Sequence, residues 1–215
     1  MRPGRGAWLT ELSAADANDV RPEDIYWRLV SRASAGDPEA FRVIFDRYSK
    51  PVMSFIYNMI GDRAHAEELA QETFVRAYCR LGSMRDQRRF SSWLFGIARN
   101  VVREAHKRKQ SERLPVSLED RGALNVADNR PDPEFPLLAG ELNRAIQQAL
   151  AGLSEDRRAV FVLKVIHRLR YEEIARITGF SVGKLKTDLH RARAQMRRRL
   201  MHFAVDTASG TGGAP

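Results

Sequence analysis

One glycine divides the strongest helical pattern of the sequence into two short helices. The segment upstream of Gly179, YEEIARIT (171–178), places its apolar residues on one side of a helix. The apolar residues of the second helix recur at 185, 189, 192, 196 and 200. Gly179 stands where a tight turn requires a positive φ, and Ser181 is a favourable N-cap for the second helix. The spacing of Ala175, Gly179 and Leu185 therefore predicts a helix-turn-helix.

The second of these helices is also strongly basic. Seven Lys and Arg residues lie between positions 184 and 199, against one acid, Asp188. With the apolar stripe packed inward, we expect the Lys and Arg side chains and Asp188 to face outward. A helix that lies in a DNA major groove uses this side to contact the edges of the nucleobases and the phosphates. The residues predicted to contact DNA are Ser181, Val182, Lys184, Lys186, Thr187, Asp188, Arg191, Arg193 and Arg197. The alternative is a charged helix on the surface of a helical bundle.

The composition limits the classes of partner and ligand that the chain can bind. The formal net charge of +9 favours a polyanion, either nucleic acid or an anionic membrane surface. Cys79 is the single cysteine, which excludes an internal disulfide and a cysteine-based zinc site. No apolar run approaches the roughly 20 residues that span a bilayer. We therefore expect a cytoplasmic protein with no membrane insertion, no metal and no cofactor.

A proline-rich acidic segment separates two helical domains. Residues 114–139 hold four prolines and carry five acids against two bases, so they are expected to form an extended linker. We find no alternation typical of strands, so the predicted fold class is all-α. The predicted divisions are a disordered extension 1–21, a first domain 22–113, the linker 114–139, a second domain 140–203 and a flexible tail 204–215.

The sequence also predicts where several helices begin and end. Asp37, Asp62 and Ser154 are expected to cap helices, and Gly61 is expected to end one. Pro51 is expected to break or kink the helix that contains it.

The first domain combines aromatic and basic residues. Phe90, Trp93 and Phe95 are followed by Arg99, Asn100 and further bases. Aromatic rings with neighbouring cations suit single-stranded nucleic acid, because bases stack while cations hold the backbone. The alternative is packing in the core, which we favour for Trp93 and Phe95.

Three segments of the sequence resemble one known family. They are GDRAHAEELAQETFVRAY (61–78), FSSWLFGIARNVVREAHKR (90–108) and the segment from LSEDRR to RRRL (153–200). In this order and spacing they are similar to the extracytoplasmic-function (ECF) sigma factors, the small two-domain sigma subunits of bacterial RNA polymerase. The resemblance covers about 25–110 and 142–201 and implies a sigma region 2 followed by a sigma region 4.

The resemblance implies partners and contact residues. Region 2 is expected to bind the clamp helices of the polymerase β′ subunit through Glu67, Glu68, Gln71 and Glu72. It is expected to melt and read the promoter −10 element, holding a flipped base in the loop 85–90. The residues expected to contact the −10 strand are Arg85, Asp86, Gln87, Arg88, Arg89, Phe90, Arg99, Asn100, Arg103 and Lys107. Region 4 is expected to read the −35 element with the basic helix and to touch the β flap.

The resemblance further implies an anti-sigma partner, no catalytic activity and a linker that threads toward the polymerase active-site channel. The sequence departs from the family at three positions. Lys184 stands where a small hydroxylic residue is common, Asp188 where a base is common, and Arg170 where Ser is common. A dimeric helix-turn-helix regulator that acts without core polymerase is the alternative function. We find no carboxylate cluster or ligand spacing that supports an enzyme.

Overall fold

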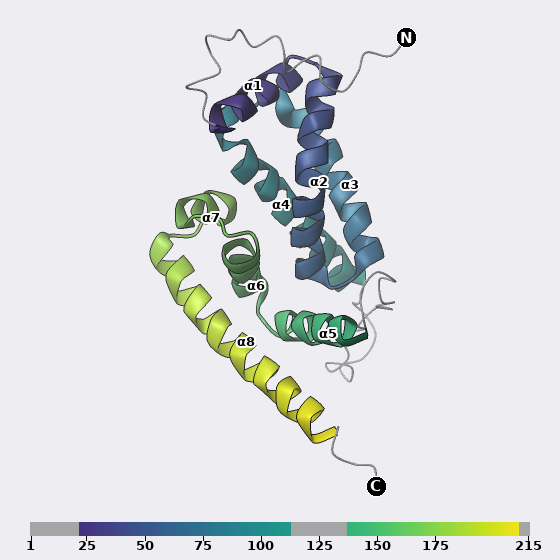
Figure 1. The fold of residues 1–215 in the computed structure, drawn as a ribbon. Coiled ribbons are helices and arrows are strands. Elements are labelled where there is room, and N and C mark those ends of the chain that lie inside the picture. Colours follow the sequence, from purple (N-terminus) through teal and green to yellow (C-terminus); the bar gives the residue numbers. More distant parts are fainter. Residues whose placement is uncertain (1–21, 113–136, 211–215) are drawn as a thin grey trace.

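Helices make up all the regular elements of residues 22–112 and 137–210, which are the residues that the computed structural model describes. The predicted all-α class is confirmed. The first domain contains α1 (Pro22–Ser34), α2 (Pro38–Ile60), α3 (Arg63–Leu81), the short helix η1 (Gln87–Arg89) and α4 (Phe90–Glu112). The second contains α5 (Leu137–Ala151), α6 (Glu155–Phe161), the π-helical turn η2 (Val162–Ile166), α7 (Tyr171–Thr178) and α8 (Val182–Gly210). Figure 1 shows α7 beside α4, which joins the two domains.

Aspartates and glycines set the helix ends of the first domain as the sequence predicts. The Asp37 carboxylate accepts hydrogen bonds from the amides of Glu39 at 3.0 Å and Ala40 at 3.1 Å, which satisfies two free donors at the start of α2. Asp62 accepts from the amide of His65 at 3.1 Å at the start of α3. Gly61 ends α2 with a φ of 78°. Ser154 precedes α6 as predicted, but its side chain makes no capping hydrogen bond.

Helix α2 continues through Pro51, so a break at this position, one of the two predicted outcomes, does not occur. The residues that follow the proline face the core, where Val52, Phe55 and Ile56 are each fully buried. Burial of these side chains offsets the backbone hydrogen bond that proline cannot donate. Tertiary packing therefore keeps one continuous helix across a residue that would stop an isolated one.

The predicted second domain contains the helix-turn-helix. Gly179 adopts a φ of 75°, and its amide donates to the Ala175 carbonyl at 2.8 Å, which closes α7. The Ser181 hydroxyl then accepts from the Lys184 amide at 3.3 Å, as an N-cap should. The predicted stripe of α8 faces inward: four members are buried and the fifth, Leu200, is half-buried.

Two helices extend past the predicted bounds of the second domain, 140–203. Helix α5 begins at Leu137, three residues before that domain's predicted start. Helix α8 continues to Gly210, past the expected end at 203, because the sequence offers no proline or glycine between 201 and 209 to stop it. The predicted extension 1–21, linker residues 114–136 and tail residues 211–215 lie outside the described residues.

We predict that Gly179→Ala destabilises the protein by about 1 kcal/mol, because an L residue is strained in the left-handed region. Steric crowding is not the cause, since a Cβ at this position meets no atom within 4 Å. Gly179→Asn should cost less, because Asn tolerates this conformation. Gly96→Ala, within helix α4 and equally uncrowded, should instead stabilise by up to about 1 kcal/mol. Urea unfolding followed by circular dichroism measures all three, and equal effects at both glycines contradict the backbone explanation.

Candidate functional site

The outward side of α3 carries the four residues expected to bind polymerase. Glu67, Glu68 and Gln71 are exposed, and Glu72 is half-buried. Two apolar side chains, Val75 and Tyr78, are exposed further along the same helix. An exposed surface that combines carboxylates with large apolar side chains is suited to a protein partner.

Glu72 differs from its neighbours because it belongs to an internal ion-pair network. Arg76 contacts Glu72 at 2.6 Å and Glu104 of α4 at 2.6 Å, so one guanidinium joins α3 to α4. These hydrogen bonds raise the pKa of Arg76 and, from the other side, lower the pKa of Glu104. Arg108 adds a second cation 3.8 Å from Glu72. The carboxylate of Glu72 is therefore held in place, whereas Glu68 and Gln71 project freely into solvent.

The loop that precedes α4 carries three arginines around Asp86, an aspartate that stabilises the loop. Asp86 accepts from the Arg88 amide at 3.2 Å and pairs with Arg89 at 2.8 Å, which fixes the turn η1. Arg85, Arg88 and Arg89 are exposed, as expected for contacts with a nucleic acid strand.

Phe90 is placed differently from the other predicted loop residues. Its ring is buried, with an exposed fraction of 3%, and packs edge-on against Tyr48 and beside Trp93. The expectation that Phe90 contacts the −10 strand is therefore not supported by its position. The physical reason is that the first residue of α4 points inward, so that its ring closes the core beneath the loop.

A hollow of about 330 Å³ lies beside this loop. Arg85, Asp86 and Arg89 line one part of it, and Trp93 contributes an aromatic wall. Arg176 of α7 also lines the hollow, so the second domain reaches over the loop of the first. Cations beside an aromatic ring form an environment that suits an unstacked base.

The predicted contact residues on α4 separate into two groups. Asn100, Arg103 and Lys107 are exposed. Arg99 is buried, with an exposed fraction of 6%, and its guanidinium lies 3.5 Å from the Asp156 carboxylate of α6. Burial lowers the pKa of Arg99, with Arg103 adding to this effect and Asp156 opposing it. Arg99 therefore faces the second domain in this structure.

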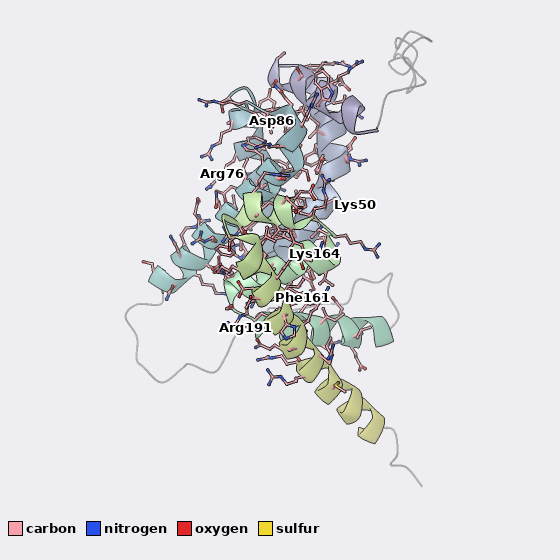
Figure 2. All side chains as sticks on the ribbon, turned by 90° about the vertical axis from the view of Figure 1, so that its left-hand side faces the viewer. Lys50, Arg76, Asp86, Phe161, Lys164 and Arg191 are labelled. Carbon is pink, nitrogen blue, oxygen red and sulfur yellow. The ribbon has the colours of Figure 1, made fainter. Side chains whose placement is uncertain are left out.

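Helix α8 presents most of its predicted bases to solvent. Lys184, Lys186, Arg191, Arg193 and Arg197 are all exposed, as are Ser181 and Thr187, while Val182 is half-buried. Figure 2 shows Arg191 on α8, well away from Asp86 in the first domain. The helix thus offers a broad cationic surface on the side opposite the apolar stripe.

The expectation that Asp188 faces outward is wrong. Its exposed fraction is 8%, and its carboxylate accepts from Lys184 at 2.6 Å and lies 3.8 Å from Arg157 of α6. Helical periodicity places Asp188 at the edge of the apolar stripe, where α6 covers it. A carboxylate buried at this edge is stabilised because two cations compensate its charge.

His190 is an exposed residue of α8 that the sequence interpretation missed. At 100° per residue it lies on the outward side of the helix with Gly183, Thr187 and Ala194, all of which are exposed. Counting positions from the middle of the apolar stripe, rather than counting charges, would have identified it.

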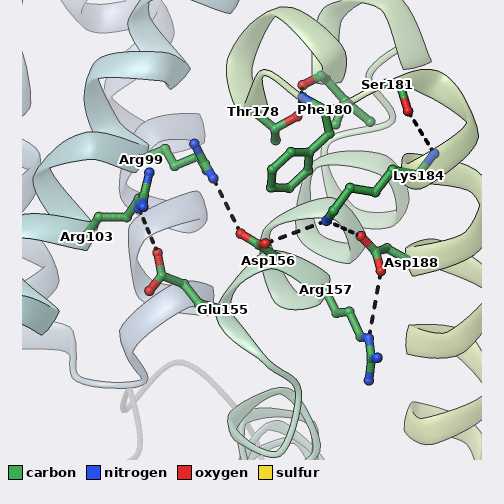
Figure 3. A network of polar contacts seen from close by, with 11 residues as sticks. Arg99, Arg103, Glu155, Asp156, Arg157, Thr178, Phe180, Ser181, Lys184 and Asp188 are labelled. Atoms are coloured by element: carbon green, nitrogen blue, oxygen red, sulfur yellow. Dashed lines mark hydrogen bonds and ion pairs between the residues drawn. The ribbon is translucent and has the colours of Figure 1, made fainter.

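A network of polar contacts connects the two domains between α4, α6 and α8 (Figure 3). The Asp156 carboxylate lies 3.5 Å from Arg99 of α4 and 3.6 Å from Lys184 of α8. The ring of Phe180, in the turn before α8, lies 5.5 Å from the Arg99 guanidinium and 3.6 Å from the Lys184 ammonium, both cation–π contacts. Glu155 adds a contact to Arg103 at 3.4 Å. Neither Asp156 nor Phe180 was singled out from the sequence.

His167 forms a second contact between the domains. Its ring centroid lies 6.2 Å from that of Phe55 in α2 and 5.2 Å from that of Phe95 in α4. Burial lowers its pKa from 6.5 to about 4, and its Nε2 atom is buried without a hydrogen-bond partner. The histidine is therefore held in its neutral form against two aromatic rings of the first domain.

Within residues 22–112 and 137–210, no helix is long and apolar enough to cross a membrane, and no group of side chains has the composition of a metal site.

Both domains match known family models. Residues 44–112 match Sigma-70 region 2, and residues 143–196 match Sigma-70, region 4. The chain is 35% identical over 177 residues to the ECF RNA polymerase sigma factor SigW of Bacillus subtilis, a match that covers 80% of this chain and 94% of that protein. It is 34% identical over 188 residues to the ECF RNA polymerase sigma factor BldN of Streptomyces coelicolor, covering 87% and 69% of the two chains.

The fold is also similar to that of a solved sigma factor. The sigma factor RpoE of Bartonella quintana, determined in complex with the anti-sigma factor NepR, aligns with a TM-score of 0.60 at 23% identity, covering 75% of this chain and 96% of that one. The two family matches and the identity with SigW show that the chain belongs to the ECF RNA polymerase sigma factors. Its function is that of this class: it directs RNA polymerase to promoters for transcription initiation.

The burial of His167 predicts a pH-dependent stability. Because its pKa is lower in the folded protein than the ordinary 6.5, the unfolded chain binds a proton between pH 6.5 and about 4 that the folded protein does not. We expect the free energy of unfolding to fall as the pH decreases through this window. In His167→Leu the decrease should be shallower, because one titrating group has been removed. Urea unfolding at several pH values measures the difference, and identical slopes in the two proteins contradict this burial of His167.

Proposed function

We propose that this chain binds core RNA polymerase through α3, contacts the −10 strand through α4 and its preceding loop, and reads the −35 duplex through α8. The observation that carries this proposal is that one protein combines a helix-turn-helix with a second, separate cationic surface in the first domain. A helix-turn-helix alone reads duplex DNA. Arg85, Arg88 and Arg89, together with Asn100 and Arg103, provide a surface suited to a melted strand.

The polymerase contact is assigned to Glu67, Glu68 and Gln71, with Glu72 as a contributor held by Arg76. Exposed carboxylates favour a basic partner surface, here the clamp helices of the polymerase β′ subunit. The second domain is proposed to contact the flap of the polymerase β subunit. The free energy of binding polymerase at these surfaces offsets the cost of unstacking the flipped −10 base, which is a few kcal/mol.

The −10 contacts are assigned to the loop and to the exposed face of α4. The hollow beside Arg85 and Trp93 is the candidate place for the flipped base, and the adjacent Asp86 and Gln87 are the candidates for reading it. Asn100, Arg103 and Lys107 follow as contacts with the strand.

The −35 contacts are assigned by position on α8. Thr187 lies at the centre of the outward face, with His190 on one side of it and Arg191 and Lys184 on the other, where they meet base edges. Lys186, Arg193 and Arg197 lie on one flank, where they meet phosphates. Asp188 contributes by orienting Lys184 through their 2.6 Å contact and not by reaching a base itself.

A dimeric helix-turn-helix regulator is the less favoured alternative, because it leaves the first domain without a role. We also propose that the protein is not an enzyme and that it works in the cytoplasm, where RNA polymerase is found. An anti-sigma factor is a proposed partner, supported by the complex of the similar RpoE fold with NepR.

Glu68→Lys is predicted to weaken binding to core polymerase by about tenfold, because it places a cation against a basic surface. Glu141→Lys makes the same charge change on exposed α5 of the second domain and should bind like the wild type. Fluorescence anisotropy of labelled protein with purified core polymerase measures the affinity. Run-off transcription on a promoter library then tests the function. Specific duplex binding by a dimer, without any affinity for core polymerase, would favour the regulator.

Substitutions on α8 are expected to separate phosphate contacts from base contacts. Lys186→Ala and Arg193→Ala should weaken promoter binding for all sequences and reduce the salt slope by about 0.9 for each lost phosphate contact. Lys184→Ala and His190→Ala should instead change the preferred −35 sequence. The matched control is Arg144→Ala on exposed α5. Binding of the polymerase holoenzyme to a library of −35 duplexes over a range of KCl concentrations provides both readouts. If all four variants behave alike, the assignment of the two groups is wrong.

A further inference from the structure

Arg168, in the connection between η2 and α7, has a backbone conformation that L residues rarely adopt. Its φ is 56°, and within residues 22–112 and 137–210 it is the one residue other than glycine with a positive φ. The other positive values there belong to Gly36, Gly61 and Gly179. A left-handed backbone costs an L residue folding free energy, because its Cβ approaches the following carbonyl oxygen. Arg168 is therefore strained where a glycine would not be.

The surrounding turn holds Arg168 in this conformation. Arg168 follows His167, the C-cap residue of η2, at the position where glycine commonly ends a helix. On its other side, the amide of Leu169 donates to the Leu163 carbonyl at 3.1 Å. The Leu169 carbonyl in turn accepts from the Lys164 ammonium at 2.9 Å. Because these bonds bring the chain back onto η2, the residue at position 168 has to take up the left-handed backbone.

The side chain of Arg168 does not offset this strain through polar contacts within the described part of the chain. The residue is exposed, and none of the described residues forms a hydrogen bond or an ion pair with its guanidinium. The nearby Arg170, by contrast, lies 3.5 Å from the Glu173 carboxylate. Strained residues concentrate at functional sites, where the strain is tolerated for the sake of the function. A strained arginine with a free guanidinium therefore indicates an anionic partner outside the chain.

Further cations lie close to Arg168, and Tyr171 connects them to the recognition helix α8. The Lys164 ammonium lies 4.7 Å from the centroid of the Tyr171 ring, and the Lys186 ammonium of α8 lies 6.0 Å from it. Arg170, directly before Tyr171, is exposed. The connection that contains Arg168 therefore continues the basic flank of α8 to which Lys186 belongs.

This placement matches the path of a DNA backbone. In a helix-turn-helix the second helix lies in the major groove while the first helix crosses the sugar–phosphate backbone. The connection before α7 then lies at the edge of the groove, on the side of Lys186. A guanidinium suits a phosphate there, because its planar N–H donors can bind two phosphate oxygens at once.

We propose that Arg168 binds a phosphate of the −35 duplex, next to the phosphates contacted by the Lys186 flank of α8. This contact comes at the cost of folding stability, because the arginine occupies a position that favours glycine. The phosphate contact rests on the proposed function of α8, whereas the backbone strain does not. A contact with the DNA backbone adds affinity for every −35 sequence alike.

Replacement of Arg168 by two different residues separates the backbone from the side chain. Arg168→Gly and Arg168→Ala both remove the guanidinium, but only glycine also relieves the strain. In urea unfolding of the free, full-length protein, we expect a higher midpoint for Arg168→Gly and an unchanged midpoint for Arg168→Ala. Arg170→Gly is the backbone control: with a φ of −72° this residue is not strained, so glycine should lower the midpoint. A midpoint for Arg168→Gly no higher than that of Arg168→Ala overturns the trade of stability for affinity.

The phosphate contact is measured with polymerase holoenzyme and promoter fragments that carry a library of −35 sequences, over a range of KCl concentrations. Arg168→Gly and Arg168→Ala should weaken binding equally, by about three- to eightfold at about 0.1 M KCl, and reduce the salt slope by about 0.9. Arg168→Lys, which keeps the charge, should keep most of the slope. Arg144→Ala on exposed α5 is the matched control and should bind like the wild type. A protein that folds more stably yet binds DNA more weakly, as expected for Arg168→Gly, is not explained by damage to the fold.

Lys186→Ala distinguishes failure of this proposal from failure of the proposed function. If Lys186→Ala lowers the salt slope while both Arg168 variants bind like the wild type, the contact at Arg168 is overturned and the proposed function stands. If Arg168→Ala instead lowers the affinity for core polymerase and leaves the salt slope unchanged, the partner of Arg168 is a protein and the phosphate contact is again overturned. If the wild-type holoenzyme does not bind the −35 fragments, the proposed function fails and the phosphate contact fails with it.

Discussion

The contact between the two domains is built around a desolvated cation, Arg99, whose charge must be compensated. A guanidinium in the interior of a protein needs charge compensation and contact with polarisable groups. Region 4 supplies both, Asp156 from the first turn of α6 and Phe180 from the turn between α7 and α8. Because these two residues belong to the same small domain, the contacts to α4 fix its orientation as well as its distance.

The turn between α7 and α8 therefore has two roles. Gly179 closes α7 and Ser181 caps α8, which sets the angle at which the recognition helix leaves the domain. The ring of Phe180, between them, lies near Arg99 of α4. Its ring also contacts Lys184, one turn into the recognition helix. A residue that stabilises contact between the domains thus lies within the segment that positions the DNA-reading face, so the two properties are physically connected.

Helix ends and the helix-turn-helix were predictable because their causes are local. Asp37, Gly61 and Gly179 act on backbone groups within four residues, so their effect is the same whatever the rest of the chain does. The exposure of Asp188 depends instead on Arg157 of another helix, and that of Phe90 depends on Tyr48. The family resemblance identified both domains, yet it could not place Arg99, because a buried arginine and a DNA-binding arginine have the same sequence. Contacts between the domains produce no periodic pattern in the sequence, so the burial of Arg99 could not be predicted from it.

The contact between the two domains combines apolar and polar contacts. One cluster of buried apolar side chains includes Phe55 and Leu94 of region 2 as well as Leu163 and Leu185 of region 4. The contacts between α5 and α2 are polar: Asn143 donates to the Tyr57 hydroxyl at 3.2 Å, and Gln147 donates to Asn58 at 3.0 Å. Water can replace such hydrogen bonds at little cost, whereas it cannot replace the apolar contacts within each domain. The hydrogen bonds between α5 and α2 therefore contribute less to the contact between the domains than the apolar side chains that pack across it.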